Sequence, residues 1–409
     1  MQFFNFNFNF YLLFISLFIF LNWNCSEEPI QNDLSNINLR IDTLLIEGIS
    51  ARPYWIAPNL GTSDYLYLGS KNNINANYSF ITFSNNYNWS GFLDSNIIFD
   101  SLLFILYARD SLVEQPTLYY SPDSQFSEYE STYLDYTEFQ MSEWINLGQP
   151  DIKINEDTTN IDSLDHFQYS ELKWDIINHF DALTDTSDSN IVRTFILVSG
   201  NNNASVSKIF SREGLPSYRP IIKTVHFLNN QINDDSTVID TVSGQLLATG
   251  DLTIMEPTDI VQDSSNIGLS SGHGHQLILS INYDSLSLPS RALLRSAVLT
   301  INLDTTTIID DFSVFINPLN SEVDTFSFFF EEDPYQGVGY PYLVSNSTEN
   351  GILEISLKRY LQNISVGNEN NLGFKVLASP LNDPFESIRF NLNNVINPAS
   401  IKILYVSNN

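Results

Sequence analysis

Short apolar runs separated by clusters of turn-forming residues make up most of this chain after residue 40. The runs are rich in Ile, Val, Leu, Phe, Tyr and Thr, and Asn, Asp, Ser, Gly and Pro stand between them, which is typical of strands joined by turns. The run 296–303 has an apolar residue at every second position, whereas 102–107 is apolar throughout and suits a buried strand. The best helical stretches, 170–182 and 357–362, are short, so the predicted fold class is all-β.

The runs also recur in the same order in the two halves of the chain. Because order and spacing match, the sequence predicts one β-domain present twice, as tandem antiparallel β-sandwiches at 41–228 and 238–409 with a linker at 229–237. The matching segments are 99–107 with 294–303, 171–180 with 353–361, 194–199 with 372–379, 207–212 with 386–391, and 219–227 with 397–406.

Three segments carry a resemblance to a known family. These are a Ser-Ala-Val-Leu-Thr-Ile strand after a Leu/Arg segment at 293–301, the element Ile-Leu-Glu-Ile-Ser-Leu…Tyr at 352–360, and the run Ser-Arg-Glu…Arg-Pro-Ile-Ile at 211–222. Together they resemble the DNRLRE-type exported β-sandwich, a jelly-roll-like module of bacterial surface proteins related to some carbohydrate-binding modules. The family's signature hexad is absent. The resemblance implies a surface or cell-wall role with glycan binding, and it transfers no catalytic residue.

The front of the chain predicts export. Residues 1–26 carry no charged side chain, and 10–21 are almost entirely apolar. That stretch falls short of the roughly 20 residues that span a bilayer but fits the roughly 7–15 of a secretory signal. The only cysteine, Cys25, follows directly, which resembles a bacterial lipoprotein signal, although large residues precede the cysteine and the start lacks Lys and Arg. We therefore predict a signal peptide at 1–24, lipidation at Cys25 and a flexible tether at 25–40.

Two alternatives to lipidation remain open, namely ordinary secretion with a free cysteine and an uncleaved membrane anchor. Lipidation at Cys25 would place the protein in the cell envelope, anchored by lipid at the outer membrane or the cell surface. A single cysteine allows no intrachain disulfide. The net charge of −30 argues against nucleic acid, which needs clustered Lys and Arg. The predicted partners are a membrane, through the lipid, and a glycan or an envelope protein.

Aromatic side chains near turns are the candidates for a sugar-binding surface. Tyr54 and Trp55 are adjacent, and Tyr87 and Trp89 are two positions apart. Planar rings can stack against sugars, but Tyr and Trp are also favoured in strands for packing alone. Both interpretations are kept for each pair.

The candidates for metal ligands are two histidines and an acidic segment. His273 and His275 would share one face of an extended chain, and the alternative is an exposed glycine-rich loop. Asp157, Asp162 and Asp165 offer oxygen atoms at short spacing, as Ca²⁺ prefers, but the EF-hand spacing is absent. We predict no cofactor, and we leave open a structural Ca²⁺ and a transition metal at the two histidines.

No catalytic motif stands out in the chain. It has no Gly-x-Ser-x-Gly elbow, no phosphate-binding loop and no Cys/His dyad,. The predicted function is therefore non-catalytic binding or adhesion at the cell envelope, directed at glycans. The alternatives are a structural scaffold that contacts other envelope proteins through an exposed apolar patch, and a secreted polysaccharide hydrolase with two facing acids in a cleft.

Overall fold

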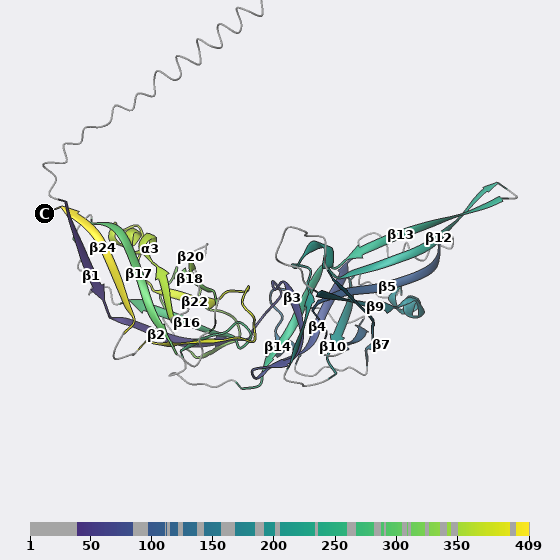
Figure 1. Ribbon diagram of the computed structural model, residues 1–409, viewed down its shortest axis with the longest axis horizontal. Helices are drawn as coiled ribbons and strands as arrows, with labels where there is room; N and C mark the ends of the chain where they lie inside the picture. Colours follow the sequence, from purple (N-terminus) through teal and green to yellow (C-terminus); the bar gives the residue numbers. More distant parts are fainter. Residues whose placement is uncertain are drawn as a thin grey trace, which may run out of the picture.

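The computed structural model is almost entirely β, and the strands of its described residues pair antiparallel except for the short parallel pair of β19 and β2. Figure 1 shows the strands in two bodies along the long axis, which we call the first and the second module. The described residues are 39–84, 97–110, 112, 115–121, 126–136, 143–156, 168–184, 192–200, 205–233, 236–259, 267–281, 288–289, 292–304, 309, 312–323, 327–335, 342–344, 351–392 and 398–408.

The second module consists of two sheets that face each other. One sheet has the order β1-β24-β17-β23-β15, with β21 paired to β17, and the other has the order β19-β2-β16-β22-β18-β20. The strands are β1 (Leu39–Ile46), β2 (Ile49–Ile56), β15 (Gly268–Leu269), β16 (His275–Ile281), β17 (Leu293–Leu303), β18 (Val314–Pro318), β19 (Phe329–Phe330), β20 (Tyr342–Val344), β21 (Ile352–Ser356), β22 (Phe374–Ala378), β23 (Ile388–Asn391) and β24 (Ser400–Asn408).

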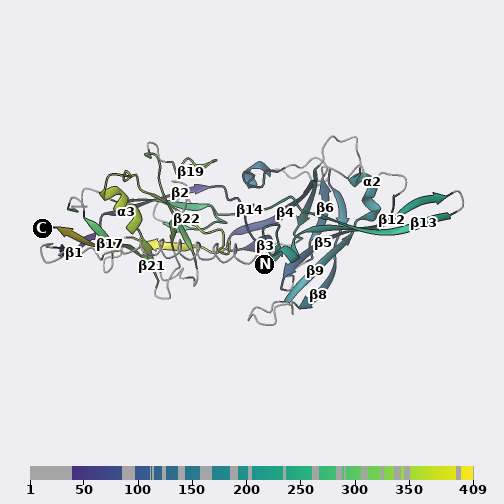
Figure 2. The same ribbon diagram turned by 90° about the horizontal axis from the view of Figure 1, so that it is seen from above.

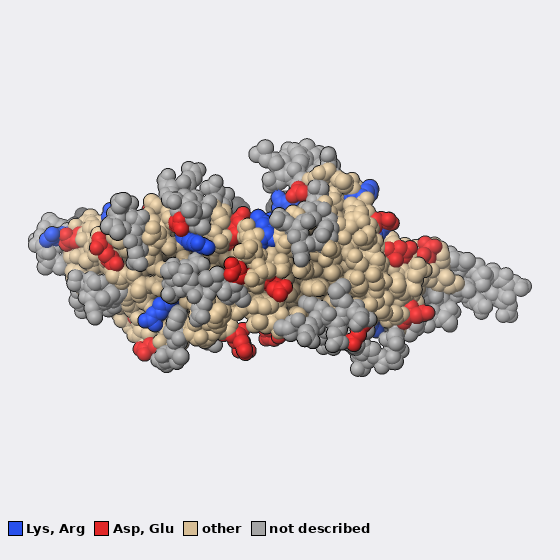
Figure 3. Space-filling view, turned by 90° about the horizontal axis from the view of Figure 1, so that it is seen from below, with Lys and Arg blue, Asp and Glu red and all other residues tan. Residues whose placement is uncertain are grey.

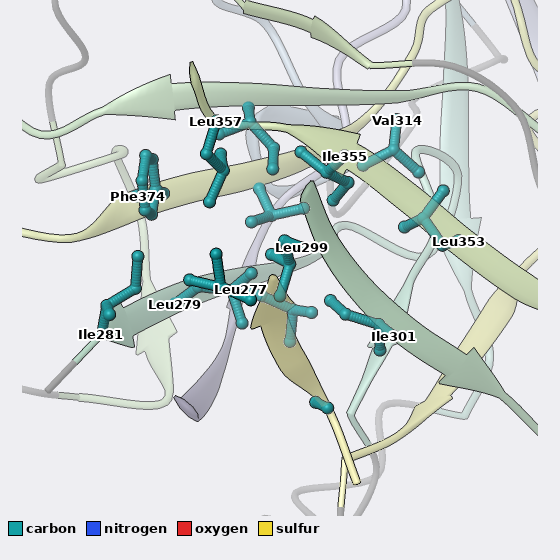
Figure 4. Close-up of a cluster of buried hydrophobic side chains, with 14 of the residues drawn as sticks. Leu277, Leu279, Ile281, Leu299, Ile301, Val314, Leu353, Ile355, Leu357 and Phe374 are labelled. Carbon is teal, nitrogen blue, oxygen red and sulfur yellow. The ribbon is translucent and has the colours of Figure 1, made fainter. Parts of the chain in front are cut away.

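The core of the second module lies between these sheets. Figure 4 shows Leu277 and Leu279 of β16 together with Leu299 and Ile301 of β17, all almost completely buried. Each such side chain contributes roughly 1.5–3 kcal/mol when it leaves water. The alternation predicted for 296–303 is confirmed, because every second side chain of β17 from Ala297 to Leu303 belongs to this core.

The first module is a twelve-stranded sheet that folds over its own core. Its main path is β13-β12-β5-β11-β3-β4-β10-β6-β7; in addition, β14 pairs with β4, β9 with β5, and β8 with β9. The strands are β3 (Tyr65–Lys71), β4 (Ile74–Ser84), β5 (Ile97–Arg109), β6 (Thr117–Ser121), β7 (Ile145–Gly148), β8 (Asp151–Glu156), β9 (Gln168–Asp175), β10 (Val192–Val198), β11 (Val206–Phe210), β12 (Ile221–Asn233), β13 (Ser236–Leu247) and β14 (Gly250–Pro257).

Helices are few and short among the described residues. The helix predicted at 357–362 is confirmed, with Leu357 as the residue that precedes α3 (Lys358–Ser365). The segment 170–182 is only partly helical, because 170–175 belong to strand β9 and the helical turns η5 (Ile177–His179) and α2 (Phe180–Leu183) follow it. Buried Leu172 and Trp174 stand two positions apart there, which is the period of a strand,.

The same pairing order occurs in both modules. The series β1-β24-β17-β21 corresponds to β13-β12-β5-β9, and β2-β16-β22-β18-β20 corresponds to β14-β4-β10-β6-β7. The five matching sequence segments fall on equivalent strands, namely β5 and β17, β9 and β21, β10 and β22, β11 and β23, and β12 and β24. The sequence repeat is therefore also a repeat of strand pairing.

The first two strands of each repeat, however, pair with the other repeat. The first arm, β1–β2 (39–56), pairs with β24 and β16, whereas the second arm, β13–β14 (236–257), pairs with β12 and β4. The boundaries predicted at 228 and 238 therefore do not separate the modules, and the predicted linker lies within the hairpin of β12 and β13. Likewise, the predicted tether ends earlier, since Leu39 and Arg40 already belong to β1.

The modules meet at a packed junction. Phe385 of the second module is 1% exposed, and its ring lies 5.6 Å from that of Tyr67 in β3. The Asn72 amide donates a hydrogen bond to the carbonyl oxygen of Phe385 at 2.8 Å, and the Lys208 ammonium lies 3.2 Å from the Asp383 carboxylate. The buried Phe385 side chain and the polar contacts around it therefore join the two modules.

Candidate ligand-binding site

A hollow lined by tyrosines lies on the outer face of the first module. Its volume is about 370 Å³, and we call it the tyrosine hollow. Three elements contribute to it: strand β4, the single helical turn η3 (Tyr133–Tyr136), and strand β14 of the second arm. The lining residues are Asn75, Asn77, Tyr78, Tyr133, Tyr136, Ile254 and Glu256.

The strand period explains why this face of the sheet is aromatic. Ile81 and Phe83 of β4 point into the main core, so Tyr78 and Phe80 point outward,. Register partners on β14 extend this face, because Leu252 lies opposite Phe80 and Ile254 opposite Tyr78. Residues 126–136 then cross over the outer face and bring further rings onto it.

Hydrogen bonds hold η3 in place over the sheet. The backbone N–H of Thr132 donates to the Asp135 carboxylate at 2.7 Å, an arrangement that caps the turn,. The Asn59 amide donates to the carbonyl oxygens of Ser131 at 2.7 Å and of Glu128 at 3.1 Å. The turn is therefore held by its own cap and by the Asn59 side chain, which bonds the residues just before it.

The rings of the hollow are supported from behind. Tyr136 stacks on the fully buried Phe80 with ring centroids 5.0 Å apart. Tyr133 meets Trp55 edge to face at 6.3 Å, and Tyr78 meets Trp144 in the same way at 6.4 Å. Such contacts favour one ring orientation, which preorganises the hollow.

The polar groups of the hollow offer hydrogen bonds in both directions. Burial, and to a smaller extent the Glu256 carboxylate, raise the pKa of the Tyr78 and Tyr133 hydroxyls, which therefore stay protonated and can donate,. The exposed Glu256 carboxylate accepts. Asn77 Oδ1 is buried and has no hydrogen-bond partner among the described residues. A buried acceptor of this kind gains when a ligand or a water donates to it.

Tyr54 and Trp55 do not form the predicted sugar platform. Tyr54 is 0% and Trp55 4% exposed. The Tyr54 hydroxyl donates to Gln276 at 2.7 Å, and its ring packs against Tyr335 at 4.9 Å. Both rings therefore pack inside the protein, and Trp55 contacts Phe329 of the second module as well as Tyr133 of the first. The other predicted pair, Tyr87 and Trp89, lies outside the described residues, as does Cys25.

The two predicted metal-ligating histidines are brought together. The rings of His273 and His275 lie 5.9 Å apart and line a cavity of about 110 Å³ that Arg389 also lines. Burial lowers the pKa of both, that of His275 to about 4, so both imidazoles are neutral at pH 7. Among the described residues no third ligand joins them. Metal binding here stays a prediction, and the predicted Asp157, Asp162 and Asp165 lie outside the described residues.

A buried carboxylate network lies elsewhere in the first module. Ligand oxygens of Glu128, Glu213 and Asp251 lie within 4.8 Å of one another, but Arg212 contributes a positive charge to the group. Its guanidinium lies 2.9 Å from Glu128 and also pairs with Glu213, and its backbone N–H donates to Asp251 at 2.6 Å. A cation is already present, so we assign the group to structure and not to a Ca²⁺ site.

The same group does not form the facing acids of a hydrolase. Burial raises the pKa of Asp251 to about 8, a shift also seen at catalytic acids. Asp251 is only 2% exposed, however, and it does not line the neighbouring cavity of about 430 Å³ that Glu213 lines. The network instead joins the second arm to residues 126–136, because the backbone N–H of Asp251 donates to Glu128 at 3.0 Å.

Comparison with family models, with curated proteins and with solved structures found no match. Among the described residues, no helix has both the length and the apolar character needed to cross a bilayer. Two signals in the sequence point to the tyrosine hollow: the alternation of Tyr78 with Phe80, and aromatic residues three or four positions apart from Phe126 to Tyr136.

Proposed function

We propose that this protein is a non-catalytic, lipid-anchored binding protein of the bacterial cell envelope, and that it holds neutral glycans in the tyrosine hollow. The observation that carries the proposal is the convergence of three half-buried tyrosines with two asparagines and one carboxylate in a single hollow. Aromatic faces pack against the C–H groups of a sugar ring. Amide and carboxylate groups pair with its hydroxyls, and such a mixture of apolar walls and a few polar groups is typical of ligand sites.

The charge of the protein favours a neutral ligand. Glu256 lines the hollow, and the whole chain carries a net charge of −30. Figure 3 shows Asp and Glu side chains spread along the molecule on the face in view. Anionic polysaccharides would be repelled at low ionic strength, whereas neutral sugars would not.

Glycan-array binding with the chain from Ser26 onward tests the proposal. Replacement of Tyr133 by Ala removes one wall of the hollow, and we expect affinity for the bound glycan to fall about tenfold or more, equivalent to ~1.4 kcal/mol. Asn77→Ala should weaken binding as well, because it removes an amide that lines the same hollow.

Leu134→Ala is the matched control. Leu134 belongs to the same helical turn, is 41% exposed and does not line the hollow. Its replacement should leave binding unchanged. Equal losses in the Tyr133 and Leu134 variants would place the effect in the turn and not in the hollow. An array on which the wild-type chain binds no glycan would reject the proposal in favour of a protein-contacting scaffold.

A further inference from the structure

The first arm is bound to strands that lie far from it in the sequence. Its eight β1 residues pair with β24, from Leu39 opposite Asn408 to Ile46 opposite Ile401. Strand β2 pairs with β16 from Ile49 to Trp55. The arm is linked covalently to the rest of its own repeat by residues 57–64, which form no strand or helix, and Trp55 also contacts Tyr133 there.

The second arm occupies the equivalent place in the first module. Strand β13 flanks β12 as β1 flanks β24, and β14 flanks β4 as β2 flanks β16. The two arms also share a sequence pattern, because Ile-Asp-Thr occurs at 41–43 and 239–241, and a proline follows at Pro58 and Pro257. Each module is therefore completed by an arm from the other repeat. Because the first arm forms no strand pair with the described strands that follow it in its own repeat, it can move apart from them without breaking a sheet.

The arm is also deeply embedded in its acceptor. Ile46 is 1% exposed and belongs to the core of the second module. Tyr54 is 0% exposed and contacts Gln276, Phe330 and Tyr335, all from that module. Without an arm the second module would expose apolar core and the edges of β24, β16 and β19. Such strand edges pair readily with another chain.

We propose that the first arm also enters the second module of another copy of this chain, so that two copies exchange arms reciprocally and form a dimer. Reciprocal exchange remakes every strand pair and core contact of the arm. Only residues 57–64 must change their path, and there the hydrogen bonds of Asn59 to Glu128 and Ser131 and the packing of Leu60 must rearrange. The order of synthesis favours the exchange. The arm emerges before β16 and β24 exist and stays unpaired while the first module folds.

Paired cysteine variants test the exchange directly in the chain from Ser26, which contains no natural cysteine. Thr43 on β1 and Leu404 on β24 are register partners, and cross-strand partners lie within disulfide reach. A Thr43→Cys chain and a Leu404→Cys chain are unfolded together, refolded on the order of 1 mM, near the effective concentration of a tethered segment, and oxidised. We expect a disulfide-linked heterodimer on a non-reducing gel.

Two controls make the result decisive. Thr43→Cys mixed with Leu381→Cys should give no such heterodimer, because Leu381 is 78% exposed but is not a partner of β1. The chain carrying both Thr43→Cys and Leu404→Cys reports whether the pair can bond at all. If that bond forms within one chain and the mixture gives no heterodimer above the Leu381 control, the proposal is overturned. Light scattering on the refolded wild-type chain is independent of the disulfide, and monomers alone would overturn it too.

Discussion

Asp251 combines deep burial with a polar role at the start of β14, in the second arm. It accepts the backbone N–H of Arg212, and its own N–H donates to Glu128. Loss of water around the carboxyl raises its pKa from 3.8 to about 8. The neutral form is therefore the stable one in the folded protein, and ionisation costs free energy at neutral pH.

This shift predicts how stability depends on pH. The folded protein binds the Asp251 proton more tightly than the unfolded chain. The contribution of this proton to the free energy of unfolding is therefore fully present below about pH 4 and is lost as pH rises to about 8,. Asp251→Asn keeps an acceptor for Arg212 and cannot ionise. We expect it to match the wild type near pH 4 and to exceed it by roughly 2–5 kcal/mol in unfolding free energy near pH 8.

Urea unfolding of both chains across this range measures the difference. Asp100→Asn is the control, because Asp100 is exposed on β5 and its removal changes the net charge equally. Parallel pH profiles for the wild type and the Asp251 variant would show that burial does not raise the pKa of this carboxyl.

At the scale of elements, the pairing of β3 with β11 depends on one glycine. Gly69 has a φ of +124°, and a Cβ on it would lie 2.1 Å from the carbonyl oxygen of Ser205. Gly148, at the end of β7, has a φ of +87°, and no atom of the described residues lies within 4 Å of such a Cβ. A side chain at Gly148 would therefore meet backbone strain alone, whereas a side chain at Gly69 would meet backbone strain and a steric collision.

Alanine at these positions should therefore have unequal effects. Gly148→Ala should lower the free energy of unfolding by about 1–2 kcal/mol, because only the positive φ disfavours alanine there. Gly69→Ala must also push β11 away, and we expect a loss of at least about 3 kcal/mol. Thermal or urea unfolding measures both, and equal losses would mean that the two strands separate without resistance at this point.

The strands and their repetition could be predicted from the sequence, but the exchange of arms could not. Alternation such as that of 296–303 reports which face is buried, and that property is local. Nothing local distinguishes β1 paired to β24 from β1 paired to β12, because the two repeats offer similar strand edges. For the same reason the polar run 229–237 suggested a linker where the chain forms a hairpin.

The predictability of the candidate site is limited by burial. Tyr54 and Trp55 have the composition of a binding surface, yet the sequence does not show that β19 and Tyr335 pack over them. Tyr133 and Tyr78 are 55 positions apart in the sequence, and only the crossing of residues 126–136 over the sheet brings them together. Contacts of this range depend on tertiary structure, which no spacing rule captures.

At the scale of the whole molecule, the junction decides whether the modules act as one body. Figure 2 shows them joined end to end, with the hairpin of β12 and β13 projecting away from the second module. Phe385 is the apolar contact at the junction described above. We expect Phe385→Ala to remove about 3–5 kcal/mol and to separate the unfolding of the two modules.

Differential scanning calorimetry tests this coupling. The variant should unfold in two transitions where the wild type unfolds in one. Leu381→Ala is the matched control from the same loop, since its side chain is 78% exposed, and it should leave the single transition in place. An unchanged single transition in the Phe385 variant would assign the coupling to the first arm, which also connects the modules.

The route of the backbone has a mechanical consequence. The chain passes from β1 through β2 directly into the first module, and the second module grips these strands from the side through β24 and β16. Tension between the residues that precede β1 and a ligand held near Tyr133 would therefore run along the arm, in parallel with the contacts at the junction. The second module would resist extension, because β24 and β16 must separate from β1 and β2 before the arm can straighten and lengthen.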